Sequence, residues 1–238
     1  MSGQTVFPGQ DGPRPCFRGV LFDLDGTLLD TAEGVLASVQ YTIETMGYPS
    51  LPDEILRAFI GPPVKQSLIR AYGIGEEEAQ RATQVFRGRY KDHDLFRAVP
   101  YPGIPELLKR LRSNGFHIGV ATLKREDYAI SLLEHFGIAA LCDSICGSDF
   151  DSKMSKCDVI LKCLQKLQLA AHDAVLIGDT ASDGEGARLA GVPFIAVTYG
   201  FGPVDCEGWN PFQPLFTADS ADAIGRFLLP EPADPARL

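Results

Sequence analysis

The sequence of 238 residues lacks a long apolar run, an excess of positive charge and closely spaced cysteines. No segment approaches the roughly 18 consecutive apolar residues that a membrane-spanning helix needs, so we expect no membrane association. Lys and Arg number 22 against 31 Asp and Glu, a net charge of −9. We therefore expect no nucleic-acid polymer as a partner, because a phosphate backbone is bound by concentrated positive charge. A small anionic substrate is compatible with this charge, since one site can be locally positive.

The six cysteines contain no Cys-x-x-Cys pair and are too sparse for a small disulfide-stapled scaffold. We expect reduced, mostly buried thiols in a cytoplasmic protein. The first 17 residues are rich in Gly, Pro and Gln and have no basic start followed by an apolar run. We interpret them as a flexible lead-in rather than a secretory signal.

The remaining composition is that of an ordinary globular protein, with 45% hydrophobic and 22% charged residues. Short apolar runs that end in polar or glycine residues are typical of buried parallel strands. We expect such strands at residues 19–22, 117–121, 174–178 and 193–197, with a weaker candidate at 144–147. Amphipathic stripes between them indicate helices. The alternation from residue 117 onward predicts an α/β fold with a Rossmann-like parallel sheet covered on both faces.

This alternation is interrupted after the first strand. From about residue 31 to 96 only helical patterns are present, with helices expected at 35–46, 52–59, 64–72 and 76–93. Asp30 and Glu33 are candidates for a capping box at the start of the first helix. We predict that residues 18–30 and 99–238 form an α/β core domain and that residues 31–98 form a separate helical domain.

Two aspartates directly follow the first strand, in Asp23-Leu24-Asp25-Gly26-Thr27-Leu28. Carboxylates at positions i and i+2 of an extended chain point to the same side. The carboxyl ends of parallel strands are where α/β sheets bind ligands, and Gly26 allows a sharp turn there. The two carboxylates repel each other unless a cation or a shared proton relieves them. An Asp-Gly turn accounts for one aspartate but not for both.

Three further groups suit phosphate chemistry. Asp179 and Asp183 follow the strand at 174–178, and carboxylates are ligands that Mg²⁺ prefers, although Asp also caps helices. Thr122 follows the strand at 117–121, where a hydroxyl either donates to a phosphate oxygen or forms a turn. Lys156 precedes a helical stripe and either neutralises a phosphoryl group or lies in solvent.

These four groups, in this order, resemble the motifs of the haloacid dehalogenase superfamily. Asp23-x-Asp25-Gly26-Thr27 is similar to the first family motif, Thr122 to the second, Lys156 to the third, and Asp179 with Asp183 to the fourth. The helical segment resembles the mobile cap domain of the family. Two stretches resemble the phosphoglycolate phosphatase-like branch, namely Phe59-Ile60-Gly61-Pro62-Pro63 and Cys157-Asp158-Val159-Ile160.

Two departures from the family pattern stand out. The second motif commonly reads Ser/Thr-Asn-Lys, but this chain has Thr122-Leu123-Lys124, which loses side-chain contacts from the middle position. No proline follows Lys156, as it often does in the third motif, and Lys153 is an alternative for the same role. The stretch Cys157-Asp158-Val159-Ile160 favours Lys156 over Lys153 as the lysine of the third motif.

The resemblance implies a Mg²⁺-dependent phosphatase acting on a small phosphorylated metabolite, phosphoglycolate-like or a nucleoside monophosphate. It implies an aspartyl-phosphate intermediate on Asp23, with Asp25 as general acid and base, oriented by Thr27. Thr122 and Lys156 would stabilise the phosphoryl oxygens. The implied metal ligands are Asp23, Asp25 through its backbone carbonyl, Asp179 and Asp183, and the implied substrate contacts are Gly26, Thr27, Leu123 and Lys65.

Other interpretations stay open at this level. A phosphomutase acting on a sugar phosphate would keep all four motifs, and a non-catalytic phosphate-binding module would keep the fold. Lys65 is equally compatible with an ordinary surface lysine of the helical segment. The sequence does not decide between a monomer and a homodimer.

Overall fold

The computed structural model describes residues 16–150 and 153–229. Six parallel strands form one sheet in the order β5-β4-β1-β6-β7-β8, which confirms the predicted parallel α/β sheet. The strands are β1 (Gly19–Phe22), β4 (His117–Arg125), β5 (Ser144–Ser148), β6 (Ala174–Gly178), β7 (Phe194–Val197) and β8 (Phe216–Ala218). The first strand in the chain therefore lies in the middle of the sheet, between β4 and β6.

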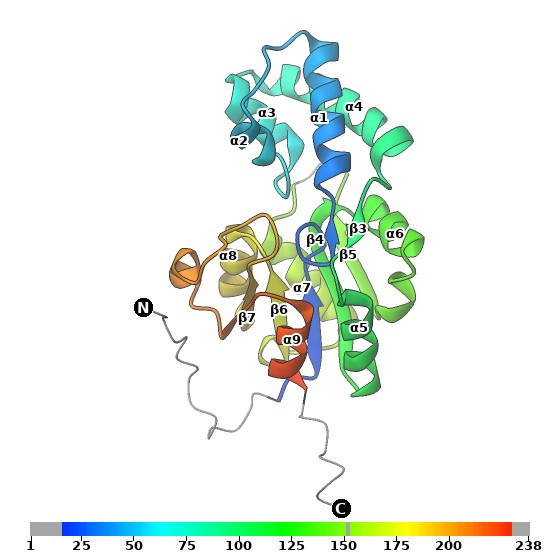
Figure 1. The fold of residues 1–238 in the computed structure, drawn as a ribbon, viewed down its shortest axis with the longest axis vertical. Helices are drawn as coiled ribbons and strands as arrows, with labels where there is room; N and C mark the ends of the chain where they lie inside the picture. Colours follow the sequence, from blue (N-terminus) through cyan, green and yellow to red (C-terminus); the bar gives the residue numbers. More distant parts are fainter. Residues whose placement is uncertain (1–15, 151–152, 230–238) are drawn as a thin grey trace, which may run out of the picture.

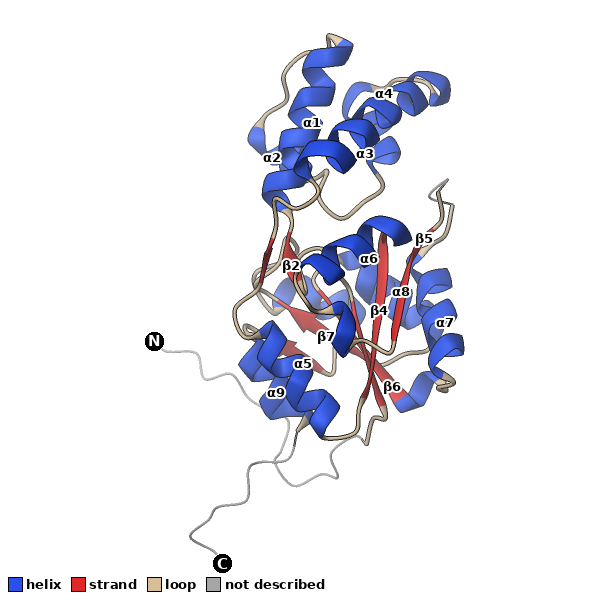
Figure 2. Cartoon of the chain, turned by 90° about the vertical axis from the view of Figure 1, so that its right-hand side faces the viewer, coloured by secondary structure: helices blue, strands red, loops and turns tan. Residues whose placement is uncertain are grey.

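Helices cover both faces of the sheet because the strand residues alternate in direction. Val20 and Phe22 of β1 point to the face that packs against α5, α6 and α9, whereas Leu21 points to the face that packs against α7 and α8. Figure 2 shows α5 and α9 on one side of the sheet and α7 on the other. These helices are α5 (Ile104–Ser113), α6 (Glu126–His135), α7 (Lys156–Leu167), α8 (Ala181–Ala190) and α9 (Ala221–Leu228).

Strand β4 differs from its prediction in a way that affects the site. It continues to Arg125 instead of ending at Ala121, with a register shift against β5 between these two residues. Thr122 therefore lies within the strand and not after it. The three-residue strand β8 was not predicted, because three residues carry too little periodicity to be distinguished from a loop.

A separate group of helices is stacked on one end of the α/β part (Figure 1). This helical block consists of α1 (Ala32–Met46), α2 (Asp53–Arg57), α3 (Val64–Tyr72), α4 (Glu76–Arg89) and the π-helical turn η1 (Tyr90–Asp94). The helix predicted at 76–93 is thus an α-helix up to Arg89 that widens into a π turn. The predicted division into two domains, with boundaries near residues 31 and 98, stays a prediction.

Two short connections join the helical block to the sheet, and they pair with each other. β2 (Leu29–Asp30) and β3 (Val99–Pro100) form an antiparallel ladder. Next to it, the backbone N–H of Gly34 donates to the Arg97 carbonyl at 3.0 Å. A Cβ at Gly34 would lie 2.3 Å from the carbonyl oxygen of Asp94, so only glycine allows this close approach.

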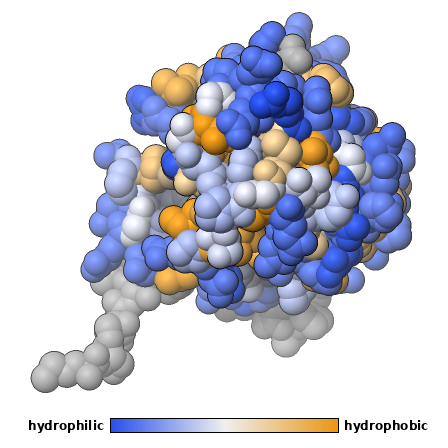
Figure 3. Space-filling model, turned by 90° about the horizontal axis from the view of Figure 1, so that it is seen from above, coloured by the Kyte–Doolittle hydropathy of each residue, from blue (hydrophilic) through white to orange (hydrophobic). Residues whose placement is uncertain are grey.

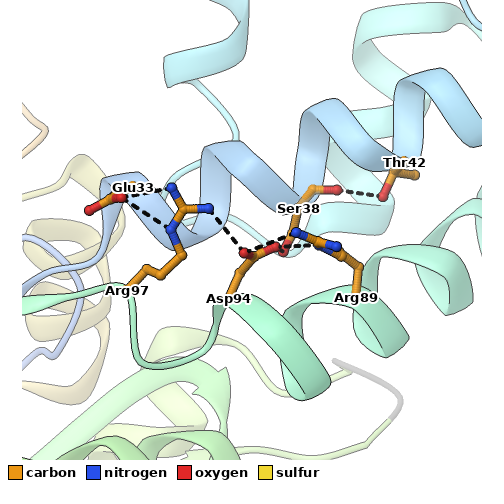
Figure 4. Close-up of polar contacts among 6 residues, drawn as sticks. All are labelled: Glu33, Ser38, Thr42, Arg89, Asp94 and Arg97. Carbon is orange, nitrogen blue, oxygen red and sulfur yellow. Dashed lines mark hydrogen bonds and ion pairs between the residues drawn. The ribbon is translucent and has the colours of Figure 1, made fainter.

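The buried Asp94 carboxylate ties the base of the helical block together (Figure 4). It accepts hydrogen bonds from Ser38 of α1 at 2.9 Å, Arg89 of α4 at 2.7 Å and Arg97 of the connection at 3.2 Å. Burial alone would raise the pKa of Asp94, but these donors hold it below its usual value. The cluster therefore joins the second connection and two helices into one unit.

The predicted capping box at the start of α1 is not formed. The Asp30 carboxylate accepts from the backbone N–H of Ala32 at 3.0 Å, but Glu33 turns away to pair with Arg97 at 2.7 Å. The residue that precedes the helix is Thr31, and its hydroxyl is used elsewhere, as described below.

Three smaller predictions concern the ends and the surface of the chain. The lead-in prediction falls mostly outside the described residues, but Phe17, its last residue, is buried in the core. The six thiols are free, and only Cys146 and Cys163 are buried, so the prediction of mostly buried thiols is wrong. Within residues 16–150 and 153–229, no helix is long and apolar enough to cross a membrane.

The outer face of the helical block is largely hydrophilic with small apolar groups (Figure 3).

Candidate active site

The first aspartate pair lies at the carboxyl end of the central strand. The backbone N–H of Asp23 continues the sheet by donating to the Ile177 carbonyl of β6 at 2.9 Å. Asp23 and Asp25 are both buried. Gly26 then turns the chain with a φ of 82°, and a Cβ there would lie 2.0 Å from an oxygen of Asp179. The glycine is required both by the turn and by the approach of the next carboxylate.

Lys156 joins two of the buried carboxylates. Its Nζ lies 2.5 Å from Asp23 Oδ1 and 2.6 Å from Asp183 Oδ1, and only 4% of its side chain is exposed. Lys156 is the first residue of α7, and Gly186 of α8 leaves room for its stem, since a Cβ there would lie 2.6 Å from the Lys156 Cγ. Lys153 is exposed, so the structure brings Lys156 and not Lys153 to the aspartates.

Asp179 and Asp183 follow β6 and are held by hydrogen bonds from two sides. Asp179 accepts from the Thr27 hydroxyl at 3.0 Å and from the backbone N–H of Phe201 at 2.8 Å. Asp183 Oδ2 accepts from the backbone N–H and the hydroxyl of Thr180, at 3.0 and 2.6 Å. The contact made by Thr27 corrects its predicted role, because its hydroxyl orients Asp179 and not Asp25.

Carboxylate oxygens of Asp23, Asp179 and Asp183 lie within 4.8 Å of one another, and all three residues are buried. Burial raises the pKa of Asp23 to about 7, an effect that Lys156 opposes and Asp183 and Asp25 strengthen. Burial also raises the pKa of Asp179, with Asp183 and Asp23 adding to it. Three carboxylates face one ammonium, which leaves a deficit of two positive charges. The donor set therefore fits one divalent cation that prefers oxygen ligands, such as Mg²⁺.

Asp25 is not part of this cluster through its side chain. Its Oδ1 accepts from the Thr31 hydroxyl at 2.5 Å and lies 3.0 Å from the Lys124 Nζ. Burial lowers the pKa of Lys124, but Asp25 and Tyr90 raise it by more, so the lysine stays charged. The predicted contribution of Asp25 to a metal site through its backbone carbonyl stays a prediction.

Thr122 lies at the same end of the sheet and is 1% exposed. Its oxygen accepts from the backbone N–H of Lys124 at 3.2 Å, and this leaves the hydroxyl proton available to a phosphate oxygen. Leu123 and Lys65 both line the adjoining cavity, and Lys65 also pairs with Glu76 of α4.

This cavity of about 430 Å³ lies between the helical block and the sheet. The core contributes Asp25, Leu123 and Lys124, and the block contributes Phe59, Lys65 and Arg87. A small molecule in the cavity therefore touches both the carboxyl end of the sheet and the helices above it.

The comparisons with known proteins agree with this geometry. The family model of haloacid dehalogenase-like hydrolases matches residues 20–197. The chain belongs to this family. The match begins at the central strand and ends with β7, so it includes every aspartate and lysine described above and the helical block.

Individual relatives of this haloacid dehalogenase-like hydrolase carry several names. The chain is 37% identical over 190 residues to the 5′-nucleotidase of Pseudomonas aeruginosa, covering 79% of this chain and 86% of the relative. It is 32% identical over 204 residues to the phosphoglycolate phosphatase of Agrobacterium fabrum, covering 83% and 88%. It is 35% identical over 187 residues to the tyrosine-protein kinase PtkA of Mycobacterium tuberculosis, covering 78% of this chain but only 64% of that protein.

A solved structure is similar over nearly the whole fold. The crystal structure of a "predicted phosphatase" from Clostridium acetobutylicum superposes with a TM-score of 0.82 at 38% identity, covering 88% of this chain and 96% of that one. The arrangement of sheet and helices is thus shared with an experimentally determined structure.

Several contacts at the site of this hydrolase were not predicted from the sequence. They include those made by Thr31, by Lys124 and by the backbone of Phe201. A signal existed for Lys124, because it lies two residues after Thr122 on extended chain and so points to the same side. Thr31 and Phe201 carry no such signal, since their contacts depend on how two loops return to the sheet.

The excess of buried carboxylates over positive charge at the site predicts how the free energy of unfolding depends on pH. The folded-state pKa of Asp23, about 7, exceeds its ordinary value of 3.8, so the folded, metal-free protein binds this proton more tightly than the unfolded chain. This contribution to stability is complete below the ordinary value and is lost as the pH rises through the folded value. We expect the free energy of unfolding in EDTA to fall as the pH rises from about 5 to about 7.5.

Urea unfolding followed by the fluorescence of Trp209, the single tryptophan, measures this dependence. Saturating Mg²⁺ should stabilise the protein more at the upper end of the range, where the carboxylates are charged. The Asp23→Asn variant should show a flatter profile than the wild type. A wild-type profile in EDTA that is level or rising over this range contradicts the assignment of the raised pKa.

Proposed function

We propose that this haloacid dehalogenase-like hydrolase is a phosphatase that hydrolyses small phosphate monoesters, with Asp23 as the nucleophile. The observation that carries the proposal is the position of Asp23 at the end of the central strand. Lys156 holds its Oδ1 at 2.5 Å, and two further carboxylates lie beside it. The names of the relatives support a phosphate ester as the substrate, because they include a 5′-nucleotidase and a phosphoglycolate phosphatase.

The residues suit a two-step phosphoryl transfer. In the first step the Asp23 oxygen that is not paired with Lys156 attacks phosphorus, the ester P–O bond breaks, and Asp25 donates its proton to the leaving oxygen. In the second step Asp25 takes a proton from water, the water oxygen attacks phosphorus, and the bond to Asp23 breaks. Inorganic phosphate is released and both aspartates return to their starting forms.

Lys156 and Thr122 would supply positive charge and a hydrogen-bond donor to the phosphoryl group. The Lys156 ammonium lies against the nucleophile, and the Thr122 hydroxyl lies at the same end of the sheet. Such preorganised groups stabilise the negative charge of the transition state without rearranging. Asp23, Asp179 and Asp183 would hold Mg²⁺, which supplies further positive charge next to the phosphate oxygens.

The helical block would act as the cap of this enzyme and select the leaving group. The cavity of about 430 Å³ has apolar walls, such as Phe59, together with basic groups, such as Lys65 and Arg87. Its size and mixed lining suit an organic leaving group that also carries a polar or anionic part. A nucleoside monophosphate and phosphoglycolate are therefore the two substrates to test first.

A phosphate-release screen tests the proposal. Wild-type protein is incubated with nucleoside monophosphates, phosphoglycolate and sugar phosphates, in Mg²⁺ and in EDTA, and inorganic phosphate is measured. We expect release from at least one ester in Mg²⁺ and a loss of at least ~100-fold in EDTA, because three carboxylates without their cation repel the phosphate dianion.

Two outcomes would contradict the proposal. Release that is unchanged in EDTA would exclude the metal, and no release from any ester in Mg²⁺ would exclude the phosphatase. Free phosphate is the readout because a mutase would instead return the phosphate to the sugar. One relative is named as a tyrosine-protein kinase, and a kinase transfers phosphate to another molecule instead of to water. The screen should therefore also identify which molecule accepts the phosphoryl group.

A further inference from the structure

We propose that Lys124 is a positioning residue that fixes the rotation of the Asp25 carboxylate, so that only Oδ2 exchanges protons with the leaving group. This inference rests on the proposed function, in which Asp25 is the general acid. It assigns a role to the third position of the Thr122-Leu123-Lys124 run, to which none was given above, and it makes a prediction about the chemistry of the leaving group.

Both donors to the Asp25 carboxylate contact the same oxygen atom. The Lys124 Nζ and the Thr31 hydroxyl both act on Oδ1, at 3.0 and 2.5 Å. Both donors are held in place, since Thr31 is 1% exposed and the Lys124 side chain is 8% exposed. With Oδ1 committed to two donors, Oδ2 is the oxygen left to carry a proton toward the cavity, which Asp25 lines.

The position of Lys124 follows from the extension of β4. The strand continues past Ala121 to Arg125, which carries Lys124 to the same end of the sheet as Asp25. The ammonium group also lies over the ring of Tyr90, 4.9 Å from its centroid. Tyr90 belongs to η1 and is itself packed by Phe86 at 5.5 Å and Tyr128 at 5.7 Å. Lys124 is therefore clamped between the sheet and the helical block, as a positioning group must be.

A second role for Lys124, direct binding of the phosphoryl group, would also lower activity when the lysine is lost. The two roles differ in how the loss depends on the leaving group. An alkoxide needs a proton to leave, whereas p-nitrophenolate leaves without one. Loss of proton donation by Asp25 therefore slows alkyl esters selectively, whereas loss of phosphate binding slows every ester alike.

The experiment compares kcat/KM for two substrates in the wild type and in Lys124→Met. One substrate is p-nitrophenyl phosphate, and the other is adenosine 5′-monophosphate or phosphoglycolate, whichever the wild type hydrolyses faster. The value of kcat/KM depends only on the steps up to the departure of the leaving group, so hydrolysis of the intermediate does not affect it. We expect a loss of at least ~100-fold for the alkyl ester and of less than ~10-fold for p-nitrophenyl phosphate. Lys124→Arg should restore the alkyl ester to within ~10-fold of the wild type, since it returns a charged donor.

Lys162→Met is the matched control, because Lys162 is also ion-paired, with Glu126 at 2.6 Å, but does not line the cavity above Asp25. It should leave both substrates unchanged. Equal losses for the two substrates in Lys124→Met, or no loss for either, would overturn the inference. If circular dichroism shows that Lys124→Met does not fold, Lys124→Gln takes its place, with the same two outcomes. A wild type that hydrolyses neither ester would overturn the proposed function itself. If the wild type is active and Lys124→Met changes kcat/KM by the same factor for both esters, only the role of Lys124 is overturned.

Discussion

Asp23→Asn is expected to lower the rate of phosphate release by at least ~10⁴-fold at saturating Mg²⁺. The amide cannot attack phosphorus, and no other carboxylate of the described residues occupies the end of β1 beside Lys156. The substitution keeps an oxygen that can accept from the Lys156 Nζ, which lies 2.5 Å from Asp23 Oδ1, so the local packing should persist. Steady-state phosphate release over a range of enzyme concentrations measures the residual rate.

The stability of the same variant separates lost chemistry from lost fold. Removing one charge from a cluster with too many carboxylates should leave the metal-free protein at least as stable as the wild type. Asp222→Asn is a suitable control, since Asp222 is an exposed carboxylate that pairs with Arg226 on the surface of α9. A residual rate within tenfold of the wild type in Asp23→Asn would remove Asp23 as the nucleophile.

Lys156→Met is expected to impair both stability and activity. It removes the ammonium that lies 2.5 Å from Asp23 and 2.6 Å from Asp183, with both carboxylates still buried. Breaking a buried ion pair from one side costs about 3–5 kcal/mol, because the remaining charge has no partner. We expect a loss of this size in urea unfolding in EDTA. We also expect a loss of about 10²–10³-fold in kcat, the usual effect of removing one donor to a developing charge.

Lys153→Met tests the alternative third-motif lysine directly. Lys153 is exposed at the edge of the cavity, so its loss should change stability little and activity by less than ~10-fold. A larger loss of activity in Lys153→Met than in Lys156→Met would reverse the assignment of the two residues. Adding Mg²⁺ should recover part of the stability lost in Lys156→Met, since the cation offsets the same carboxylates.

The sequence predicted the parts of the site that follow directly from strand ends. Asp23, Asp25 and Asp179 come directly after apolar runs, and the carboxyl ends of parallel strands meet at one edge of the sheet. The convergence of Asp23 and Asp179 therefore required only the correct strands and their order, whereas Lys156, on the first turn of α7, was assigned through the family resemblance. The choice of Lys156 over Lys153 also agrees with the geometry, because only Lys156 lies on the first turn of α7 against the aspartates.

The orientation of the Thr27 and Thr31 hydroxyl groups could not be predicted from the sequence. Thr27 follows Asp25 by two residues, so a contact between them was a reasonable expectation, but the turn at Gly26 directs its hydroxyl to Asp179. Thr31, four residues further on, reaches Asp25 instead. Which hydroxyl faces which carboxylate depends on a turn and on the start of α1, and neither leaves a periodic pattern in the sequence.

Placing the first strand of the chain at the centre of the sheet has a consequence for biosynthesis. The neighbours of β1 are β4 and β6, which leave the ribosome about one hundred residues or more after it. The helical block, in contrast, is contiguous from Ala32 to Asp94, so all of it has been synthesised before β4 is made. The cluster of Asp23, Asp179 and Asp183 therefore cannot assemble until α8 has emerged, and a translation product that ends before α8 lacks Asp183.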